Sequence, residues 1–284
     1  MSNRAPTVSG TTYTFTFGDT VLTVDAAKAG RIVSFALDGR NILTAAKSSE
    51  DNNWGSTFWC SPQSDWNWPP PAEMDPQPYV ARLADGTLVL ESATIAALGL
   101  AVTKRFSVDA GRGVVRIEYG IVNRSAQAKR VAPWEISRVA AGGLTFFPMG
   151  DGQPWKGFQE LLPLSIVDGV AWLPSETRPA SVDQKAFADG REGWIAHVAG
   201  DLLLVKSFPG ITAAQAAPGE AEIELYTDSG RTYVEVENQG ACEELAPGAS
   251  LAWPVRWLLR RLDAGVKVAP GSAELVSLVR RLLR

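Results

Sequence analysis

Polar and apolar residues alternate along most of this sequence, in short stretches that end at Gly, Asp or Asn. An alternation of this period is typical of a β-strand with one buried and one solvated face. Roughly a dozen such strands with a single helix predict an all-β protein, built as a large antiparallel β-sandwich. The alternating stretches are residues 12–26, 30–39, 86–95, 100–110, 113–123, 194–208, 221–228 and 232–239.

Near the end of the chain the apolar residues recur with the period of an α-helix. Ser272 precedes these residues and can cap a helix by accepting a backbone N–H bond, while Arg280 and Arg281 lie on the polar side. We therefore expect a C-terminal amphipathic helix that begins after Ser272. Its apolar positions, at helical spacing, are Leu275, Val276, Val279, Leu282 and Leu283.

The composition indicates a globular protein. The chain has 284 residues, 45% of them hydrophobic and 20% charged, which is enough to bury a sizeable core. No stretch has the composition of a linker, so we expect a single domain over residues 1–284. The formal net charge is −4 and the basic residues are scattered, except near the end of the chain. Nucleic acid is therefore not an expected partner, because its binding needs a continuous basic face. The sequence does not indicate the oligomeric state.

Cys60 and Cys242 are the two cysteines, too few for a disulfide framework, although a single bridge between them stays open. The chain as given begins without an apolar segment of signal-peptide length, and no window reaches the roughly twenty apolar residues of a membrane span. We expect a cytoplasmic protein that does not bind a membrane; a leader absent from the given sequence is the alternative.

Metal and cofactor motifs are missing from the sequence. His197 is the one histidine, so a site of several histidines cannot be built. No phosphate-binding glycine loop and no nucleophile elbow occurs either. We expect no metal and no cofactor, and we interpret His197 as a structural or surface residue.

The segment from Asn53 to Tyr79, the Trp-rich segment, holds four of the ten tryptophans and six of the eighteen prolines. Its run of three prolines cannot continue a helix or lie in a central strand, which predicts an ordered loop. Indole rings can stack on the apolar faces of a sugar, and the alternative is a loop held down by its own buried rings. The residues expected to contact a ligand are Trp54, Trp59, Gln63 and Trp66.

Carboxylates are the remaining candidates for acid–base chemistry. Glu235 and Glu237 lie two apart in an alternating stretch and so share one face of a strand, although a solvated sheet face explains Glu235 equally well. Glu135 follows a Pro-Trp pair. Among the basic residues in strand-like stretches, Arg105 and Lys206 are those we expect to orient or neutralise a substrate.

Three stretches together resemble the galactose mutarotase-like superfamily, the aldose 1-epimerase type of β-supersandwich. They are AGRIVSFALDGRNIL (residues 29–43), VTKRFSVDAGRGVVRIEYGIVNRS (102–125), and YTDSGRTYVEVENQ followed by LAPGASLAWPVRW (226–257). The stretches occur in the family's order and cover most of the chain between Thr12 and Trp257. The resemblance implies an antiparallel β-supersandwich with a carbohydrate ligand.

The resemblance also implies roles for two glutamates. In the family a glutamate on a late strand, closely followed by a glutamine, removes the proton from the anomeric hydroxyl, and Glu237 before Gln239 occupies that place. The family's two histidines are missing here: the Trp-rich segment replaces the earlier one, and Trp134-Glu135 replaces the later one. Glu135 can serve as the acid only if burial or a nearby carboxylate raises its pKa.

The functional hypothesis is a carbohydrate-binding protein similar to aldose 1-epimerases, with anomer interconversion through Glu237 as base and Glu135 as acid. The alternatives are a sugar-binding module without catalysis, and an interaction protein that uses the Trp-rich segment as its interface. The sequence indicates neither the sugar nor whether it is phosphorylated.

Overall fold

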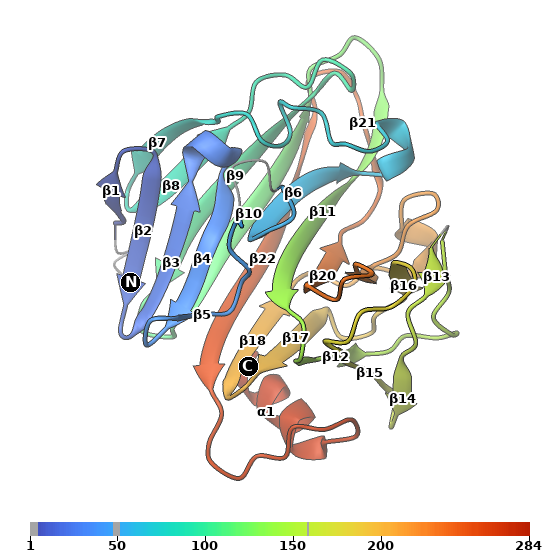
Figure 1. Ribbon diagram of the computed structural model, residues 1–284. Helices are drawn as coiled ribbons and strands as arrows, with labels where there is room; N and C mark the ends of the chain where they lie inside the picture. Colours follow the sequence, from blue (N-terminus) through green and yellow to red (C-terminus); the bar gives the residue numbers. More distant parts are fainter. Residues whose placement is uncertain (1–4, 48–51, 158) are drawn as a thin grey trace.

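The computed structural model describes residues 5–47, 52–157 and 159–284. Two large β-sheets stack face to face, and a single α-helix among the described residues closes the chain (Figure 1). Neighbouring strands run antiparallel, except that β13 and β16 are parallel. The predicted all-β sandwich with a C-terminal helix is confirmed. Within the described residues, no helix has the length and apolarity needed to span a membrane.

The first sheet has twelve strands within the described residues. The strands lie in the order β1-β2-β3-β4-β6-β11-β20-β19-β16-β13, with β5 beside β4 and β21 beside β11. Their bounds are β1 Thr7–Ser9, β2 Thr12–Phe17, β3 Thr20–Asp25, β4 Arg31–Leu37, β5 Arg40–Asn41, β6 Ser56–Ser61, β11 Lys129–Ala140, β13 Glu160–Leu161, β16 Gln184–Ala188, β19 Ile223–Thr227, β20 Tyr233–Gln239 and β21 Glu243–Leu245.

The second sheet has ten strands in the part of the chain that is described. The order is β14-β15-β12-β17-β18-β22-β10-β9-β8-β7, so the long strand β22 lies at its centre. The bounds are β7 Val80–Ala84, β8 Thr87–Glu91, β9 Leu100–Asp109, β10 Val114–Asn123, β12 Leu144–Pro148, β14 Ser165–Val167, β15 Val170–Pro174, β17 Trp194–Ala199, β18 Leu202–Ser207 and β22 Ser250–Arg261. Short 3₁₀ turns are η1 Ala26–Lys28, η2 Gln63–Asp65 and η3 Ala213–Gln215.

The main core lies between the two sheets. Alternate residues of each strand point inward, so that Phe35 of β4 packs at 5.7 Å from Trp257 of β22, and Phe58 of β6 stacks at 4.3 Å on Tyr119 of β10. All four side chains are buried. Burying a side chain of this size stabilises the fold by roughly 1.5–3 kcal/mol, so the sheet contact is the main source of stability.

The C-terminal helix α1, Ala273–Leu282, covers part of the outer face of the second sheet (Figure 1). Ser272 caps it by accepting the N–H of Leu275 at 3.3 Å, as the sequence predicted. Leu275, Val276 and Val279 pack in a second apolar cluster. The strand residues of this cluster include Phe146, Trp172, Trp194, Leu203, Val205 and Leu258.

The Trp-rich segment is not a loop throughout, which corrects the sequence prediction. Residues Ser56–Ser61 form β6, a strand inside the first sheet between β4 and β11. All six residues are buried, because packed side chains cover both faces of this strand. The polar–apolar alternation that marks a half-buried strand is therefore absent here, and the run of three prolines suggested a loop.

Candidate ligand-binding cleft

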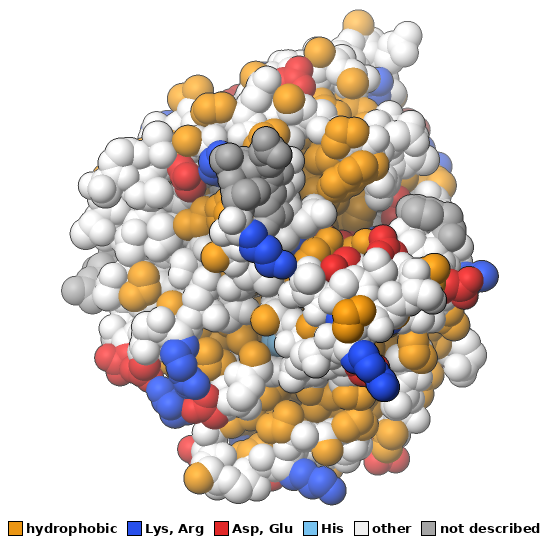
Figure 2. Space-filling model, in the orientation of Figure 1, with side chains coloured by type: hydrophobic (Ala, Val, Ile, Leu, Met, Phe, Trp, Pro, Cys, Tyr) orange, Lys and Arg blue, Asp and Glu red, His pale blue; other side chains and the backbone are white. Residues whose placement is uncertain are grey.

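A cleft of about 410 Å³ opens on the outer face of the first sheet, where β6, β11, β20, β19 and β16 lie side by side. Small-molecule sites typically occupy roughly 300–1,000 Å³. Figure 2 shows hydrophobic side chains gathered over this part of the molecule, with acidic side chains beside them. The lining residues are Asn53, Trp59, Gln63, Trp68, Trp134, Gln159, Asp183, Lys185, Tyr226, Tyr233 and Glu235.

Strand register places the lining residues on one face. Trp59 of β6 pairs with Trp134 of β11, and Tyr226 of β19 pairs with both Lys185 of β16 and Glu235 of β20. Directly paired residues on antiparallel strands project to the same side of a sheet. The cleft is therefore built on regular strands, and the rest of the Trp-rich segment adds to its wall.

Tryptophans form the apolar part of the cleft. Trp59 contacts Trp66, Trp68 and Trp134 edge to face, with ring centroids 5.6, 5.9 and 5.3 Å apart. Edge-to-face contacts of this kind stabilise aromatic clusters beyond simple burial. Trp68 is 54% exposed, whereas Trp59 is buried, so Trp68 offers a ligand the largest free indole surface.

A buried ion pair fixes the Trp-rich segment to the sheet. Arg31 of β4 donates from Nη2 to both carboxylate oxygens of Asp75, at 2.8 and 3.0 Å. Trp59 Nε1 donates to the same carboxylate at 3.2 Å. Arg31 Nη1 donates to the carbonyl oxygens of Asn52 and Trp54. This network holds Trp59 in place from behind.

Trp54 and Trp66, two of the residues predicted to contact a ligand, pack behind the cleft and support its tryptophans instead. The guanidinium carbon of Arg31 lies 4.7 Å from the centre of the Trp54 ring. Trp66 donates from Nε1 to the carbonyl of Cys60 at 2.7 Å and packs 6.5 Å from Trp134. Neither Trp54 nor Trp66 lines the cleft, whereas Trp59 and Gln63 do.

Lys185 joins two carboxylates on the cleft floor. Its Nζ lies 2.6 Å from Glu224 Oε2 and 3.3 Å from Glu237 Oε1. Glu237 also accepts from Trp134 Nε1 at 2.8 Å, and Glu224 accepts from Gln239 Nε2 at 2.6 Å. Glu224 and Glu237 are directly paired residues of β19 and β20, and both are fully buried. Lys185 lies between them and the cleft.

Burial changes the acidity of this cluster. Removal from water raises the pKa of Glu237 to about 7, although Lys185 opposes the shift. Burial also raises the pKa of Glu224 well above its ordinary value. For Lys185, burial lowers the pKa, but the adjacent carboxylates Glu224 and Glu237 outweigh it and raise the value overall. At neutral pH the lysine holds its proton, and Glu237 is near the midpoint of its titration.

The rim of the cleft carries polar groups that are already oriented. Tyr226 donates from its hydroxyl to Asp183 at 2.8 Å, and Asp183 also accepts from the backbone N–H of Ser229. Glu235 accepts from Arg138 Nε at 2.8 Å. Each carboxylate is thereby held with oxygens available for hydroxyl donors of a ligand.

Glu135 and Lys206 lie away from the cleft, which corrects the sequence prediction. Although adjacent to Trp134, Glu135 points to the opposite face of β11, into the core between the sheets. There it accepts from Tyr119 at 2.6 Å and pairs with Lys206 Nζ at 2.9 Å. Lys206 also donates to Ser137 and to the carbonyl of Val236. The prediction that Glu135 and Lys206 face a cleft with Glu237 is wrong, because both fill the sandwich interior.

Arg105 also lies away from the cleft, on the second sheet. The inward positions of β9 are taken by residues such as Lys104 and Phe106, and Arg105 points outward from the second sheet. It forms an exposed ion pair with Glu118 at 3.5 Å. Arg105 therefore does not line the cleft with the other predicted residues, because it belongs to the other sheet.

His197 is structural, as the sequence indicated. It is buried on β17, and its Nδ1 lies 2.9 Å from the hydroxyl of Thr145. Burial lowers its pKa to about 4, which keeps the ring neutral at physiological pH.

The cleft residues of β16 and β19 were not predicted from the sequence. Lys185, Glu224 and Tyr226 come from β16 and β19, short strands without an informative motif. The signal that could have found them is alternation: in AEIELYTD, Glu224 and Tyr226 recur on one side of the strand. Only the fold reveals that this side faces Trp134.

Glu237→Gln should change how stability depends on pH. The raised pKa means that the folded protein keeps this proton between about pH 4.5 and 7, where an unfolded glutamate has lost it. The contribution of Glu237 to stability therefore falls as pH rises through that window. Relative to wild type, the variant's free energy of unfolding should rise by about 1–3 kcal/mol from pH 5 to pH 8. Urea denaturation of both proteins measures this; a difference independent of pH would contradict the raised pKa.

The family model described as "Domain of unknown function (DUF4380)" matches residues 14–260. The chain belongs to this family. The description states no activity, and no curated protein matches the chain.

Solved structures resemble the whole fold. The Slr1438 protein from Synechocystis sp. PCC 6803 shares 15% identity at a TM-score of 0.62, with 92% of this chain and 98% of that chain covered. A galactose mutarotase-like protein from Lactobacillus casei shares 11% identity at a TM-score of 0.60, covering 88% and 100%. A candidate aldose 1-epimerase from Escherichia coli K12 shares 12% at 0.58, covering 89% and 99%. At such identities the likeness shows the fold alone: the galactose mutarotase-like fold implied by the sequence is confirmed.

Proposed function

We propose that this protein binds a carbohydrate in the cleft of the first sheet. The observation that carries the proposal is the combination of indole rings with oriented polar side chains in one cavity. Trp68, 54% exposed, supplies most of the free apolar surface, above the buried rings of Trp59 and Trp134. Asp183 and Glu235 supply hydroxyl acceptors. A pyranose presents the matching chemistry, with apolar ring faces and hydroxyl groups around the edge. The fold, which resembles those of a galactose mutarotase-like protein and a candidate aldose 1-epimerase, supports the same ligand class.

Binding without catalysis fits the charges better than anomer interconversion. The reaction needs a base for the anomeric hydroxyl and an acid for the ring oxygen, each with a pKa near the working pH. Glu237 has the pKa of such a base, but it lies beneath Lys185 and Trp134. Lys185 holds its proton too firmly to be an efficient acid.

The Glu224–Lys185–Glu237 cluster favours a second candidate, an anomer-interconverting enzyme. Two buried carboxylates of raised pKa share one ammonium group, so one can be protonated while the other is ionised. Such a pair resembles the acid–base pairs of sugar-active enzymes. A movement of Lys185 would be needed to bring both carboxyl groups into contact with the sugar.

Calorimetric titration and NMR exchange spectroscopy over one sugar panel separate the two candidates. We expect at least one sugar to bind, with no acceleration of α–β exchange over buffer. Acceleration that falls by a factor of about 10²–10⁴ in both Glu237→Gln and Glu224→Gln would establish the enzyme instead. Val80→Ala, a change on the exposed edge strand β7, is the control and should behave as wild type. The absence of binding by every sugar would overturn both candidates.

A further inference from the structure

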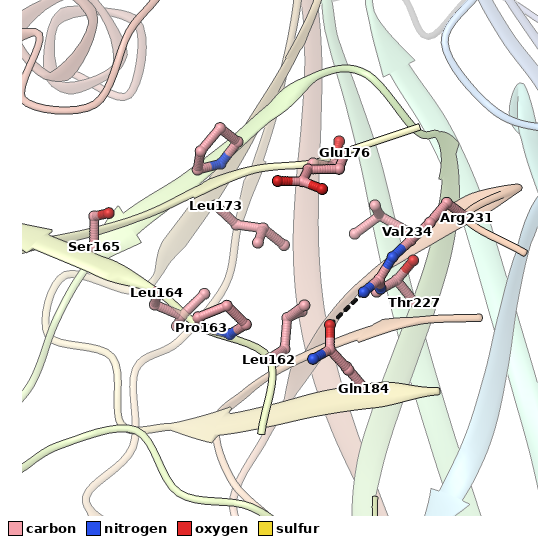
Figure 3. A pocket seen from close by; sticks show the side chains of 12 residues that line it. Leu162, Pro163, Leu164, Ser165, Leu173, Glu176, Gln184, Thr227, Arg231 and Val234 are labelled. Carbon is pink, nitrogen blue, oxygen red and sulfur yellow. Dashed lines mark hydrogen bonds between the residues drawn. The ribbon is translucent and has the colours of Figure 1, made fainter. Parts of the chain in front are cut away.

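A second cavity, of about 360 Å³, lies between the two sheets near their edge strands (Figure 3). Leu173 and Ser175 line it from the second sheet, and Gln184, Thr227 and Val234 line it from the first. The connection from Leu162 to Ser165 closes one side. The cavity is therefore built from both layers of the sandwich.

This cavity and the sugar cleft lie on opposite faces of the same three strands. Gln184, Thr227 and Val234 are paired across β16, β19 and β20 and point inward. Their chain neighbours Lys185 and Tyr226 point outward into the cleft. Because side chains alternate along a strand, one set of strands lines two separate cavities.

The inner wall of the cavity is apolar. Leu162, Leu173 and Val234 are buried with 4%, 5% and 0% of their surface exposed. Leu164 adds further hydrocarbon surface beside them. A ligand here gains from removing its own apolar part from water.

Arg231 supplies an unused hydrogen-bond donor. It lies in the turn between β19 and β20, and Figure 3 shows its side chain pointing into the cavity toward Gln184. Nη2 donates to Gln184 Oε1, whereas Nη1 is buried and has no hydrogen-bond partner among the described residues. A buried donor without a partner is unfavourable, so an acceptor bound there is favoured. A guanidinium group binds carboxylates with particularly good geometry.

We propose that this cavity is a binding site for a small organic acid, with its carboxylate on Arg231 and its hydrocarbon part against Leu162, Leu173 and Val234. A volume of about 360 Å³ lies at the small end of the range of small-molecule sites, which favours a small ligand. Glu176, exposed at the mouth, opposes Arg231 and weakens the attraction for an anion. The proposed acid site does not rest on the proposed sugar site.

Benzoate is a suitable probe, and benzamide is its uncharged counterpart of the same shape. We expect benzoate to shift the methyl NMR signals of Leu162, Leu164, Leu173 and Val234 in protein labelled at leucine and valine methyl groups. Benzamide should bind at least about tenfold more weakly, because it lacks the charge-assisted bonds to Arg231. Inorganic phosphate should leave these methyl signals unchanged. Equal binding of benzoate and benzamide, shifts elsewhere in the protein, or no shift with benzoate would overturn the proposal.

Two substitutions test the arginine directly. Arg231→Met should weaken benzoate binding about tenfold or more, whereas Arg82→Met, on the distant strand β7, should leave it unchanged. Glu176→Gln should tighten benzoate binding by about two- to threefold, because it removes a like charge at the mouth. Unchanged affinity in Arg231→Met, or weaker binding in Glu176→Gln, would contradict the assignment. The Glu176 variant keeps the test valid even if Arg231→Met fails to fold.

Discussion

Replacing Asp75 by Ala should lower the free energy of unfolding by about 3–5 kcal/mol. Asp75 neutralises Arg31 inside the protein, where the two side chains are 2% and 1% exposed. Removing the carboxylate takes from the buried guanidinium its two charge-assisted bonds to Asp75 and deprives Trp59 Nε1 of its acceptor. Because Trp59 then loses its anchor, sugar binding in the cleft should be lost together with stability.

Urea denaturation of Asp75→Ala and of a matched surface variant measures this effect. Asp201 also pairs with arginines, Arg40 and Arg261, but it is 38% exposed. Asp201→Ala should therefore cost much less stability than Asp75→Ala, since exposed ion pairs contribute little. If Asp75→Ala were as stable as Asp201→Ala, the buried pair would not be the anchor of the Trp-rich segment.

Replacing Trp68 by Ala should weaken sugar binding about tenfold or more while leaving the fold intact. Trp68 lines the cleft and is 54% exposed, so a ligand ring can cover surface that water covers in the free protein. Losing the aromatic partner of a stacked nucleic-acid base costs on the order of 1–3 kcal/mol of binding free energy, and we expect an effect of this order for a stacked sugar ring. The same exposure means that the free protein loses little packing, and we expect less than about 1 kcal/mol of destabilisation.

Calorimetric titration of Trp68→Ala with the tightest sugar of the panel checks this expectation. Leu83→Ala is the control, because Leu83 is 46% exposed but lies on the second sheet, away from the cleft. Its sugar affinity should equal that of wild type. Equal losses in the two variants, or unchanged affinity in Trp68→Ala, would remove the stacking role of Trp68.

The fold was predictable from sequence wherever one face of a strand meets solvent. β2, β3, β9 and β10 keep the alternation of half-buried strands, and their place in the fold follows from it. β6 and β12 are buried on both faces, so their patterns carry no such signal. Contacts with residues distant in the sequence determine the structure of these strands, and a local sequence pattern does not show such contacts.

The residues of the cleft could be predicted only in part from the sequence. Some are indicated by local composition, and others depend on which face of a strand they occupy. Trp59 and Gln63 could be inferred from the concentration of tryptophans in one segment. The neighbours Trp134 and Glu135 illustrate the limit: they differ by one residue along β11, yet one lines the cleft and the other pairs with Lys206 in the core. A shift of one residue changes the face, and the sequence around Glu135 does not indicate which face is inward.

The most direct test of sugar binding in this cleft follows the indole N–H signals of the tryptophans by NMR during a titration with the tightest-binding sugar. We expect the signals of Trp59, Trp68 and Trp134 to shift together, with the same affinity as calorimetry gives. The signals of Trp172 and Trp194, which pack beneath helix α1, should stay in place. Shifts at Trp172 or Trp194 without shifts at Trp68 would contradict a carbohydrate site in the cleft of the first sheet.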